Sequence, residues 1–298
     1  MEKKLKSLFI YKKNLLQKTG NEPQEELLLT ENHYDSNTNL IKEIQYGDIG
    51  QVEQLMLFEY DENGFIISEE LRDASGEVLE KKTYEPDDKG RMACEFIHYA
   101  DESADKIQYD YDAEGRLVSK KQYDDEGMLE WHSKLAYNGD KLISEITETA
   151  DGGLVTENTY EYNEKGFLVV AFINNTEESL WLRKEFEYDE EGNKLAITTF
   201  NQDGQAVERI KLENDDKGRP IQVVEENRRQ KNTQILEYDE KGEIIFQEEH
   251  DVNGELVGQI ERTFNNDGFL VESKVLIRNL QHGLTRNYSL RHEYSFYQ

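Results

Sequence analysis

The sequence predicts an all-β protein, an antiparallel meander of about ten two-stranded repeats, and three observations predict it. A short turn motif recurs along most of the chain, its glycines keep a nearly constant spacing, and the segments between turns alternate between apolar and charged residues. Only 36% of the 298 residues are hydrophobic, but 17 Tyr and 12 Phe are far more aromatic residues than disordered chains carry. We therefore expect a folded chain.

The turn motif consists of an aromatic residue, Asp or Asn, two polar residues and Gly, with an aliphatic residue two positions further on. It reads Tyr60 to Ile66, Tyr111 to Leu117 and Tyr162 to Leu168 in its clearest copies. Its glycines are Gly64, Gly90, Gly115, Gly166, Gly192, Gly218, Gly242 and Gly268. The steps between them are 26, 25, 51, 26, 26, 24 and 26 residues, where 51 spans two repeats. Such regularity indicates a repeat protein.

Each repeat contains a second turn. A further glycine follows twelve residues after the first in several copies, as Gly76 follows Gly64 and Gly127 follows Gly115. An Asp or Asn three residues before Gly is typical of a type I turn that closes in a left-handed residue, which is a common hairpin connection. Two turns in each repeat leave segments of about 7–9 residues, an ordinary length for a strand.

The segments before the repeat glycine alternate as strands do. Tyr60 and Phe58 illustrate the aromatic positions, and an acid stands between them in most repeats. A period of two places the aromatic residues on one face of the sheet and the acids on the other. These acids include Glu59, Asp110, Glu161, Glu187, Glu213 and Glu237.

A long sheet with one aromatic and one acidic face cannot leave its apolar face open to water. We therefore expect strand twist to produce a curled or spiral sheet, whose aromatic face packs on itself. A spiral shell, a wrapped superhelical sheet and an elongated two-layer meander all meet this requirement, and the sequence does not choose between them.

The ends of the chain differ from its middle in charge. Residues 1–20 carry six Lys against one Glu, and residues 274–298 carry four basic residues against one Glu. We expect an N-terminal cap or degenerate first repeat at 1–33, the repeat array at 34–273 and a basic C-terminal cap at 274–298. The alternative is head-to-tail association, in which a basic end meets the acidic face of another copy.

The recurring phrase Tyr-Asp-x-x-Gly-x-Leu resembles the YD repeats of Rhs and teneurin-type proteins, over about residues 34–270. A more distant likeness is to MORN-type repeats of antitoxin-like proteins. The first resemblance implies a curled β-shell that encloses or presents another polypeptide. The sequence is much shorter than the large YD proteins, and we expect none of their toxin or adhesion domains in it. Neither resemblance implies a catalytic residue.

The net charge of −29 restricts the partners of the protein. So negative a surface repels phosphate backbones and anionic lipids, so we expect neither nucleic acid nor a membrane as partner. A basic protein is the expected partner, and a small-molecule ligand is not expected. The sequence has no secretory signal and no apolar stretch long enough to span a bilayer, so we expect a cytoplasmic location.

Signatures of catalysis and metal binding are weak throughout. The six His residues show no metal-ligand spacing, and the chain has no phosphate-binding loop or nucleophile elbow. Turns such as Asp87–Gly90 offer too few carboxylates for Ca²⁺, so turn formation explains them better. The single Cys94 is best explained as a buried structural thiol. We expect no enzyme, no cofactor and no metal.

The function that these observations favour is a non-catalytic protein-binding scaffold. In its sharper form it is an immunity, antitoxin or chaperone-like protein that engages a basic partner through the acidic face. Trp181 has the parity opposite to the aromatic positions and is a candidate exposed contact, whereas Trp131 has the parity of the core. The alternative is a carbohydrate-binding module that uses exposed aromatics. Its candidate residues are Phe65, Trp181, Phe200 and Phe269.

Overall fold

The computed structural model describes residues 3–15, 25–279 and 283–298, and these residues form an antiparallel all-β fold with no helix. The predicted fold class is confirmed at this level. No helix in the described part of the chain could therefore cross a membrane. The strands are β1 (Leu5–Asn14), β2 (Leu27–Tyr34), β3 (Leu40–Tyr46), β4 (Val52–Tyr60), β5 (Ile66–Asp73), β6 (Val78–Pro86), β7 (Met92–His98), β8 (Ala104–Tyr111), β9 (Leu117–Tyr123), β10 (Leu129–Asn138), β11 (Lys141–Thr149), β12 (Leu154–Tyr162), β13 (Leu168–Asn175), β14 (Leu180–Tyr188), β15 (Lys194–Phe200), β16 (Ala206–Asn214), β17 (Pro220–Asn227), β18 (Lys231–Tyr238), β19 (Ile244–His250), β20 (Leu256–Phe264), β21 (Leu270–Asn279) and β22 (Leu284–Phe296).

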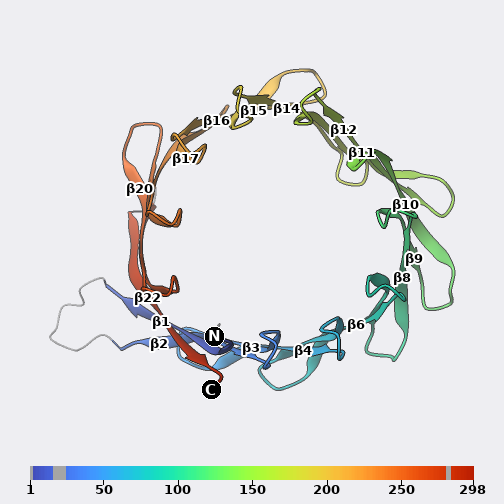
Figure 1. The fold of residues 1–298 in the computed structure, drawn as a ribbon, viewed down its shortest axis with the longest axis horizontal. Helices are drawn as coiled ribbons and strands as arrows, with labels where there is room; N and C mark the ends of the chain where they lie inside the picture. The colour runs from blue at the N-terminus through green and yellow to red at the C-terminus, as the bar shows by residue number, and fades with distance from the viewer. Residues whose placement is uncertain (1–2, 16–24, 280–282) are drawn as a thin grey trace. The chain divides into compact units, whose positions relative to one another are not determined.

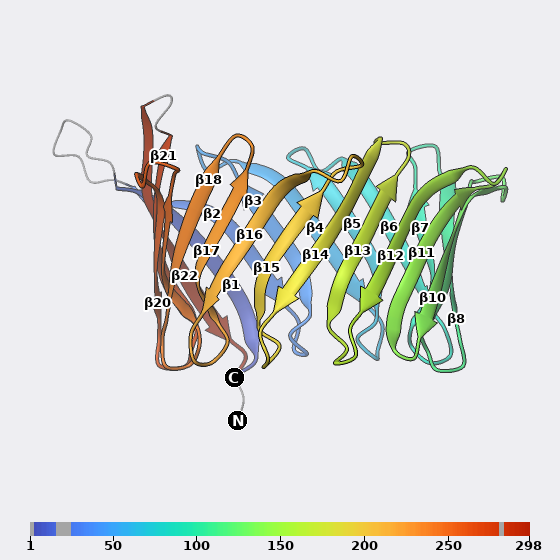
Figure 2. The same ribbon diagram turned by 90° about the horizontal axis from the view of Figure 1, so that it is seen from above.

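The chain forms two compact units. Unit 1 comprises Met1–Ala104, Tyr238–Gln247 and Val257–Gln298, and unit 2 comprises Asp105–Glu237 and Glu248–Leu256. Within each unit the strands follow one another as an antiparallel meander; in unit 2, β12 to β16 run side by side (Figure 2). The boundaries expected after residues 33 and 273 are not tested by this division and stay predictions.

The first and last strands of the chain are partners in unit 1. Leu8 of β1 lies opposite Asn32 of β2 on one side and Tyr294 of β22 on the other (Figure 1). This pairing differs from the expected curled or spiral sheet, in which the terminal strands would be free edges. The physical reason is that pairing gives the backbone N–H and C=O groups of both terminal strands a partner, which a free edge lacks.

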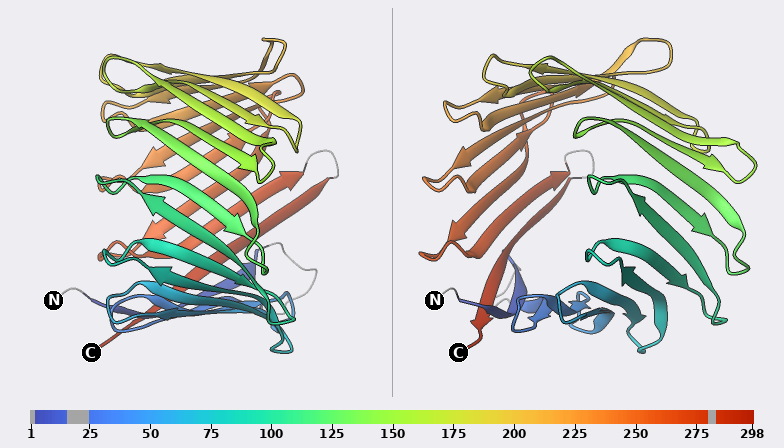
Figure 3. Two further views of the ribbon diagram at one scale, coloured as in Figure 1. Left: turned by 90° about the vertical axis from the view of Figure 1, so that its right-hand side faces the viewer. Right: turned by 45° about the vertical axis from the view of Figure 1, so that its right-hand side comes forward.

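The predicted turns are built by the side chain of their first residue. In the turn after β4, Asp61 Oδ1 accepts the N–H groups of Asn63 and Phe65, each at 2.8 Å. The N–H of Gly64 donates to the carbonyl of Asp61 at 3.1 Å, and Gly64 has a φ of +83°. Thr38 takes the glycine place in the turn after β2, with a φ of +70°. Tight turns join the green and yellow strands of unit 2 at both ends (Figure 3).

A β-bulge follows the motif tyrosine in most repeats. Tyr60 lies opposite Ile66, but Glu59 lies opposite Ser68, so β5 contains one extra residue. The same shift occurs at Tyr111, Tyr162 and Tyr188. Because a bulge reverses the parity of the residues beyond it, Glu69 comes to lie opposite the aromatic Phe58. The two faces are therefore more mixed than the parity of single strands predicts.

Most aromatic side chains are half-buried, whereas Tyr99 and Tyr297 are exposed. Among the described residues, the buried hydrophobic side chains are those of Ile44, Ala171, Ala196 and Val275. The expected packing of the aromatic face on itself would have buried large rings, and no large side chain is fully buried in the described part of the chain.

A hydrogen bond from the motif tyrosine to the neighbouring strand recurs along the sheet. The hydroxyl of Tyr60 donates to the carbonyl of Leu40 at 2.9 Å, and Tyr162 donates in the same way to Leu142. Each tyrosine stands 20 residues after the residue that accepts its hydrogen bond. The tyrosine ends one strand, and the acceptor lies at the start of the preceding strand. Burial raises the pKa of Tyr60, which keeps its hydroxyl protonated as a donor. Tyr137 and Tyr188 repeat the bond.

Candidate functional site

The six acids that the sequence singles out share one position in the structure. Each is the second-to-last residue of an even-numbered strand from β4 to β18, and all but Glu213, which precedes Asn214, stand next to the motif tyrosine. We call these residues the acid row, and the side of unit 2 to which its members there point face A. The acid row consists of Glu59 in unit 1 and Asp110, Glu161, Glu187, Glu213 and Glu237 in unit 2. All are exposed except Asp110, which is half-buried.

The residues opposite the acid row are neutral. Glu161 lies opposite Val170, Glu187 opposite Ala196 and Glu213 opposite Gln222. Residues directly opposite in an antiparallel pair face the same side, so no opposing cation neutralises these carboxylates across the strand. Within the described residues, Glu161 and Glu213 take part in no ion pair, whereas Glu187 contacts Arg209 at 3.1 Å.

Face A is not uniformly acidic. Arg209 and Lys211 precede Glu213 on the same side of β16, opposite Thr198 and Ala196. In β16 the acid therefore lies at the end of the strand, while the two cations lie nearer its middle. The structure brings the predicted acids to one strand end, and it adds basic neighbours that the parity argument did not place.

Asp110, the half-buried member of the acid row, is already paired, as Glu187 is with Arg209. Its carboxylate accepts hydrogen bonds from Lys121 and Gln108, each at 3.0 Å. Burial by itself would raise the pKa of Asp110, but these two donors outweigh burial and lower that pKa. A carboxylate that is already paired attracts a basic partner less strongly than an unpaired, exposed carboxylate of the row does.

Trp181 also lies on face A, at the start of β14 and opposite Asn174. Its ring meets Phe172 edge-on, with centroids 4.9 Å apart and planes at 87°. Arg183, two residues along β14, places its guanidinium over Phe200, 5.6 Å from the ring centroid, and pairs with Glu185 at 2.6 Å. Trp181 is half-buried.

Trp131 lies on the opposite side of the sheet, here called face B. Trp131 lies opposite Gln122 of β9, and Gln122 lies opposite Ile107 of β8. Ile107 and Tyr109 point to the same side of β8, whereas Asp110 points to face A, so Trp131 lies on the side of Tyr109. The indole Nε1 of Trp131 donates to Gln122 Oε1 at 2.9 Å. This half-buried tryptophan has a local partner, and its place on the aromatic side agrees with its parity.

The remaining aromatic candidates have covers of their own or lie in turns. Phe269 packs against Tyr294 and Phe296, with ring centroids 5.0 and 5.3 Å apart, and Arg183 covers Phe200. Phe65 lies half-buried in the turn after β4. Phe65 and Phe269 belong to unit 1, while Trp181 and Phe200 belong to unit 2.

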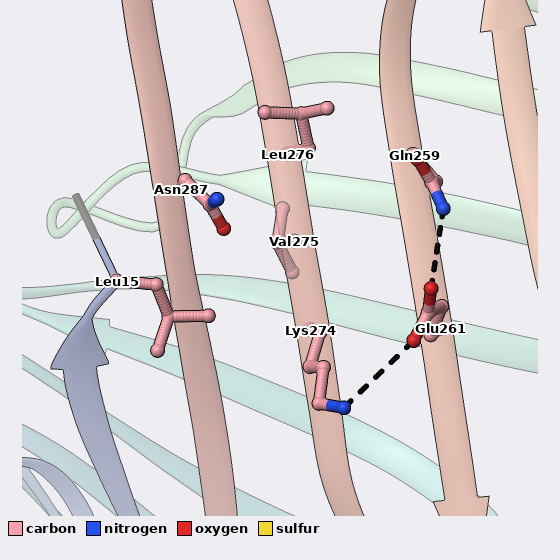
Figure 4. Close-up of a pocket in the computed structure, with 7 residues that line it drawn as sticks. All are labelled: Leu15, Gln259, Glu261, Lys274, Val275, Leu276 and Asn287. Carbon is pink, nitrogen blue, oxygen red and sulfur yellow. Dashed lines mark hydrogen bonds and ion pairs between the residues drawn. The ribbon is translucent and has the colours of Figure 1, made fainter. Parts of the chain in front are cut away.

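The cavities of unit 1 are shallow and mixed in character. One, of about 230 Å³, is lined by Gln259, Glu261 and Lys274 together with Leu15, Val275, Leu276 and Asn287 (Figure 4). Glu261 accepts a hydrogen bond from Gln259 at 3.2 Å and pairs with Lys274 at 3.9 Å. These polar groups satisfy one another. Among the described residues, no group of three or more His, Cys, Asp or Glu could hold a metal ion.

The sequence did not predict one contact between a serine and a histidine. His132 Nε2 and Ser119 Oγ are 3.0 Å apart across β9 and β10, and Ser119 also hydrogen-bonds to Asp110. Burial lowers the pKa of His132. In a catalytic triad the carboxylate orients the imidazole, but here it contacts the serine, so the arrangement is not a triad. Only the strand register brings these residues together, and no local sequence signal could have revealed them.

Comparisons with known proteins report resemblance without a function. A family model described as "Uncharacterised protein" matches residues 74–174, and no curated protein matches the sequence. A porin-like protein from Bacteroides uniformis ATCC 8492 is 9% identical, with 98% of each chain covered and a TM-score of 0.36. The Photorhabdus luminescens Tc holotoxin pore structure is 13% identical with a TM-score of 0.30; 87% of this chain is covered but only 19% of that one.

A second porin-like protein, from Bacteroides vulgatus ATCC 8482, is 12% identical with a TM-score of 0.24, and the match covers 81% of this chain and 94% of that one. With TM-scores below 0.5, these likenesses carry no argument about function. The function must therefore be argued from the residues of the chain itself.

Proposed function

We propose that this protein is a non-catalytic scaffold that binds a basic protein partner through the acid row of unit 2. The observation that carries the proposal is the set of exposed carboxylates of Glu161, Glu187 and Glu213 at the same end of alternate strands, opposite neutral residues. Alternate strands are about 10 Å apart. Such a ladder of charges suits an extended basic segment that lies across the strands.

The net charge of −29 supports the same proposal through association kinetics. A strongly negative protein attracts cationic partners over a distance of about one Debye length, which raises the association rate at low salt. Pairing at the acid row would then fix where the encounter ends. A more specific form of this proposal is an immunity, antitoxin or chaperone-like role. We also propose that the chain is related to YD-repeat proteins.

The experiment is affinity capture with the wild-type chain and with the triple variant Glu161→Gln, Glu187→Gln, Glu213→Gln, at low and at high salt. We expect the wild-type chain to recover basic proteins at low salt and to lose them at high salt. The triple variant should recover much less of the same proteins, because the ladder of charges is absent while the strands keep their shape.

The matched control is Glu164→Gln, Glu190→Gln, Asp216→Asn, which neutralises three exposed acids in the turns next to the row. Both triple variants change the net charge by the same amount, so a difference between them reports position and not total charge. Recovery of only neutral or acidic proteins, or equal losses in the two variants, would contradict binding at the acid row.

A further inference from the structure

The aromatic pair Trp181–Phe172 lies on the same side of the sheet as the acid row. Trp181, Arg183, Glu185 and Glu187 alternate along β14 and all point to face A. Trp181 and Glu187 are six residues apart on this strand, which corresponds to about 20 Å. One strand therefore joins an aromatic cluster at its start to the acid row at its end.

One cation, Arg183, lies directly opposite Phe172, and the other neighbours of the aromatic pair across the strands are polar or anionic. Across the strands, Trp181 lies opposite Asn174, which in turn lies opposite Glu157 of β12. The nearest cation on β14 is Arg183, and its charge is already engaged by Glu185 at 2.6 Å and by the ring of Phe200. The surroundings of Trp181 therefore favour an incoming cation over an anion.

The edge-to-face contact with Phe172 does not cover both faces of the Trp181 ring, and Trp181 is only half-buried. In an edge-to-face pair, the edge of one ring points at one face of the other, so the contact takes at most one face of each ring. Tryptophan provides the best face for a cation–π contact, and Arg is its most frequent partner.

We propose that Trp181, supported by Phe172, receives an Arg side chain of the basic partner by cation–π stacking, while flanking basic residues pair with Glu187 and Glu213. This inference rests on the proposed function and specifies the residue that anchors the partner. The acid row then governs the rate of encounter, and Trp181 governs the rate of dissociation, as a buried aromatic anchor does at other protein interfaces.

The two tryptophans of the chain allow a direct test, because they lie on opposite faces and are the only two. Trp131→Phe leaves Trp181 as the sole indole, and Trp181→Phe leaves Trp131. The probe is a synthetic Arg-rich peptide long enough to span two alternate strands. We expect saturable quenching of the fluorescence of Trp181 in the first variant and none of the fluorescence of Trp131 in the second.

Calorimetric titration with the same peptide measures the size of the effect. Trp181→Leu keeps an apolar side chain but removes the π face, so we expect the dissociation constant to rise roughly 5- to 30-fold. Trp181→Phe should fall between Trp181→Leu and the wild type, and Trp131→Phe should match the wild type. Unchanged affinity in a folded Trp181→Leu variant would overturn the inference.

The failure of this inference differs from the failure of the proposed function. If Trp181→Leu binds as the wild type while neutralising the acid row weakens binding, the anchor is overturned and the scaffold proposal stands. If Trp181→Leu weakens binding while the acid-row variant does not, the anchor is supported and the acid row is overturned. A neutral oligosaccharide that quenches Trp181 when the peptide does not would overturn the inference in favour of carbohydrate binding.

Discussion

At the scale of single residues, the turn aspartates hold the turns together by hydrogen bonds, a role that the net charge of the chain does not reveal. Asp61 Oδ1 accepts two backbone N–H groups, and the N–H of Phe65 in particular holds the pKa of Asp61 below its usual range. Hydrogen bonds from the same two positions after the aspartate lower the pKa of Asp73 and Asp251 as well. Part of the acidity of this chain is therefore structural, because a carboxylate is a stronger acceptor than a neutral group.

We predict an acid-sensitive contribution from these turns. A carboxyl whose pKa is lowered by folding stabilises the fold above its unfolded pKa, about 3.9 for Asp, and this contribution is lost as the pH falls through the lower folded value. Replacing Asp61, Asp73 and Asp251 by Asn should lower stability at pH 7, because the contribution of the ionised carboxylates is lost, while the turns still form because Asn Oδ1 accepts the same N–H groups. Asn163, Asn201 and Asn265 already do so in this chain.

The measurement is urea denaturation from pH 7 down to about pH 3, a window set by the usual pKa of Asp. The loss of stability below pH 4 should be smaller in the Asn variant than in the wild type. The control is the triple variant Glu62→Gln, Asp88→Asn, Glu240→Gln, which has the same net charge as the Asn variant. An identical acid transition in all three proteins would show that the turn bonds do not carry the pH dependence.

At the scale of elements, neighbouring strands are tied together by the motif tyrosine. The hydroxyl bond from Tyr162 to Leu142 spans the open end of the pair β11 and β12, beyond the last paired residues Ser144 and Thr159. It therefore adds a side-chain tie where the backbone ladder is missing. Phe264 occupies the motif position in β20, so the ring is retained there without the hydroxyl.

We predict that Tyr162→Phe lowers the free energy of unfolding by roughly 0.5–1.5 kcal/mol, because the Leu142 carbonyl loses a donor while the ring stays in place. The measurement is the denaturation midpoint in urea. Tyr123→Phe in β9 is the control, because no side-chain hydrogen bond of Tyr123 is found in the described part of the chain. Equal losses in the two variants would refute a specific role of the tie.

At the scale of the whole molecule, the sheet depends on residues at opposite ends of the sequence. The strand β22 pairs with both β1 and β21, and Glu26, close to the start of β2, forms an ion pair with Arg291 at 2.8 Å. Neither terminal segment completes its hydrogen bonding without the other. The side chain of Tyr297 adds a bond to the carbonyl of Tyr34 at 2.6 Å.

We predict that removing Leu284–Gln298 makes the protein aggregate, because β1 and β21 would each expose an unpaired edge. The measurement is size-exclusion chromatography with light scattering on freshly purified protein. Removing only Tyr297 and Gln298 leaves β22 intact and is the control. A truncated chain that stays monomeric and keeps the β signal of the wild type would contradict the role of β22.

Much of the local architecture could be predicted because the residues within each repeat specify its own turns and strands. The Asp-x-x-Gly spacing predicts the turns, and Gly64 has the positive φ that such a turn requires. The faces could be predicted only as far as the bulge, since the extra residue opposite Tyr60 reverses the parity of the residues beyond it. The candidate anchor was visible only in part: parity marked Trp181, but the contact with Phe172 depends on the register of β13 and β14.

The sequence by itself determined that this chain is an antiparallel array of short strands, because turn chemistry and the period of two act over a few residues. The tertiary structure alone decided that β1 pairs with β22, that no large aromatic ring is fully buried in the described residues, and that Trp181 lies beside Phe172 on the side of the acid row. Those features depend on hydrogen-bond partners and registers far apart in the chain, and no local pattern encodes such pairings.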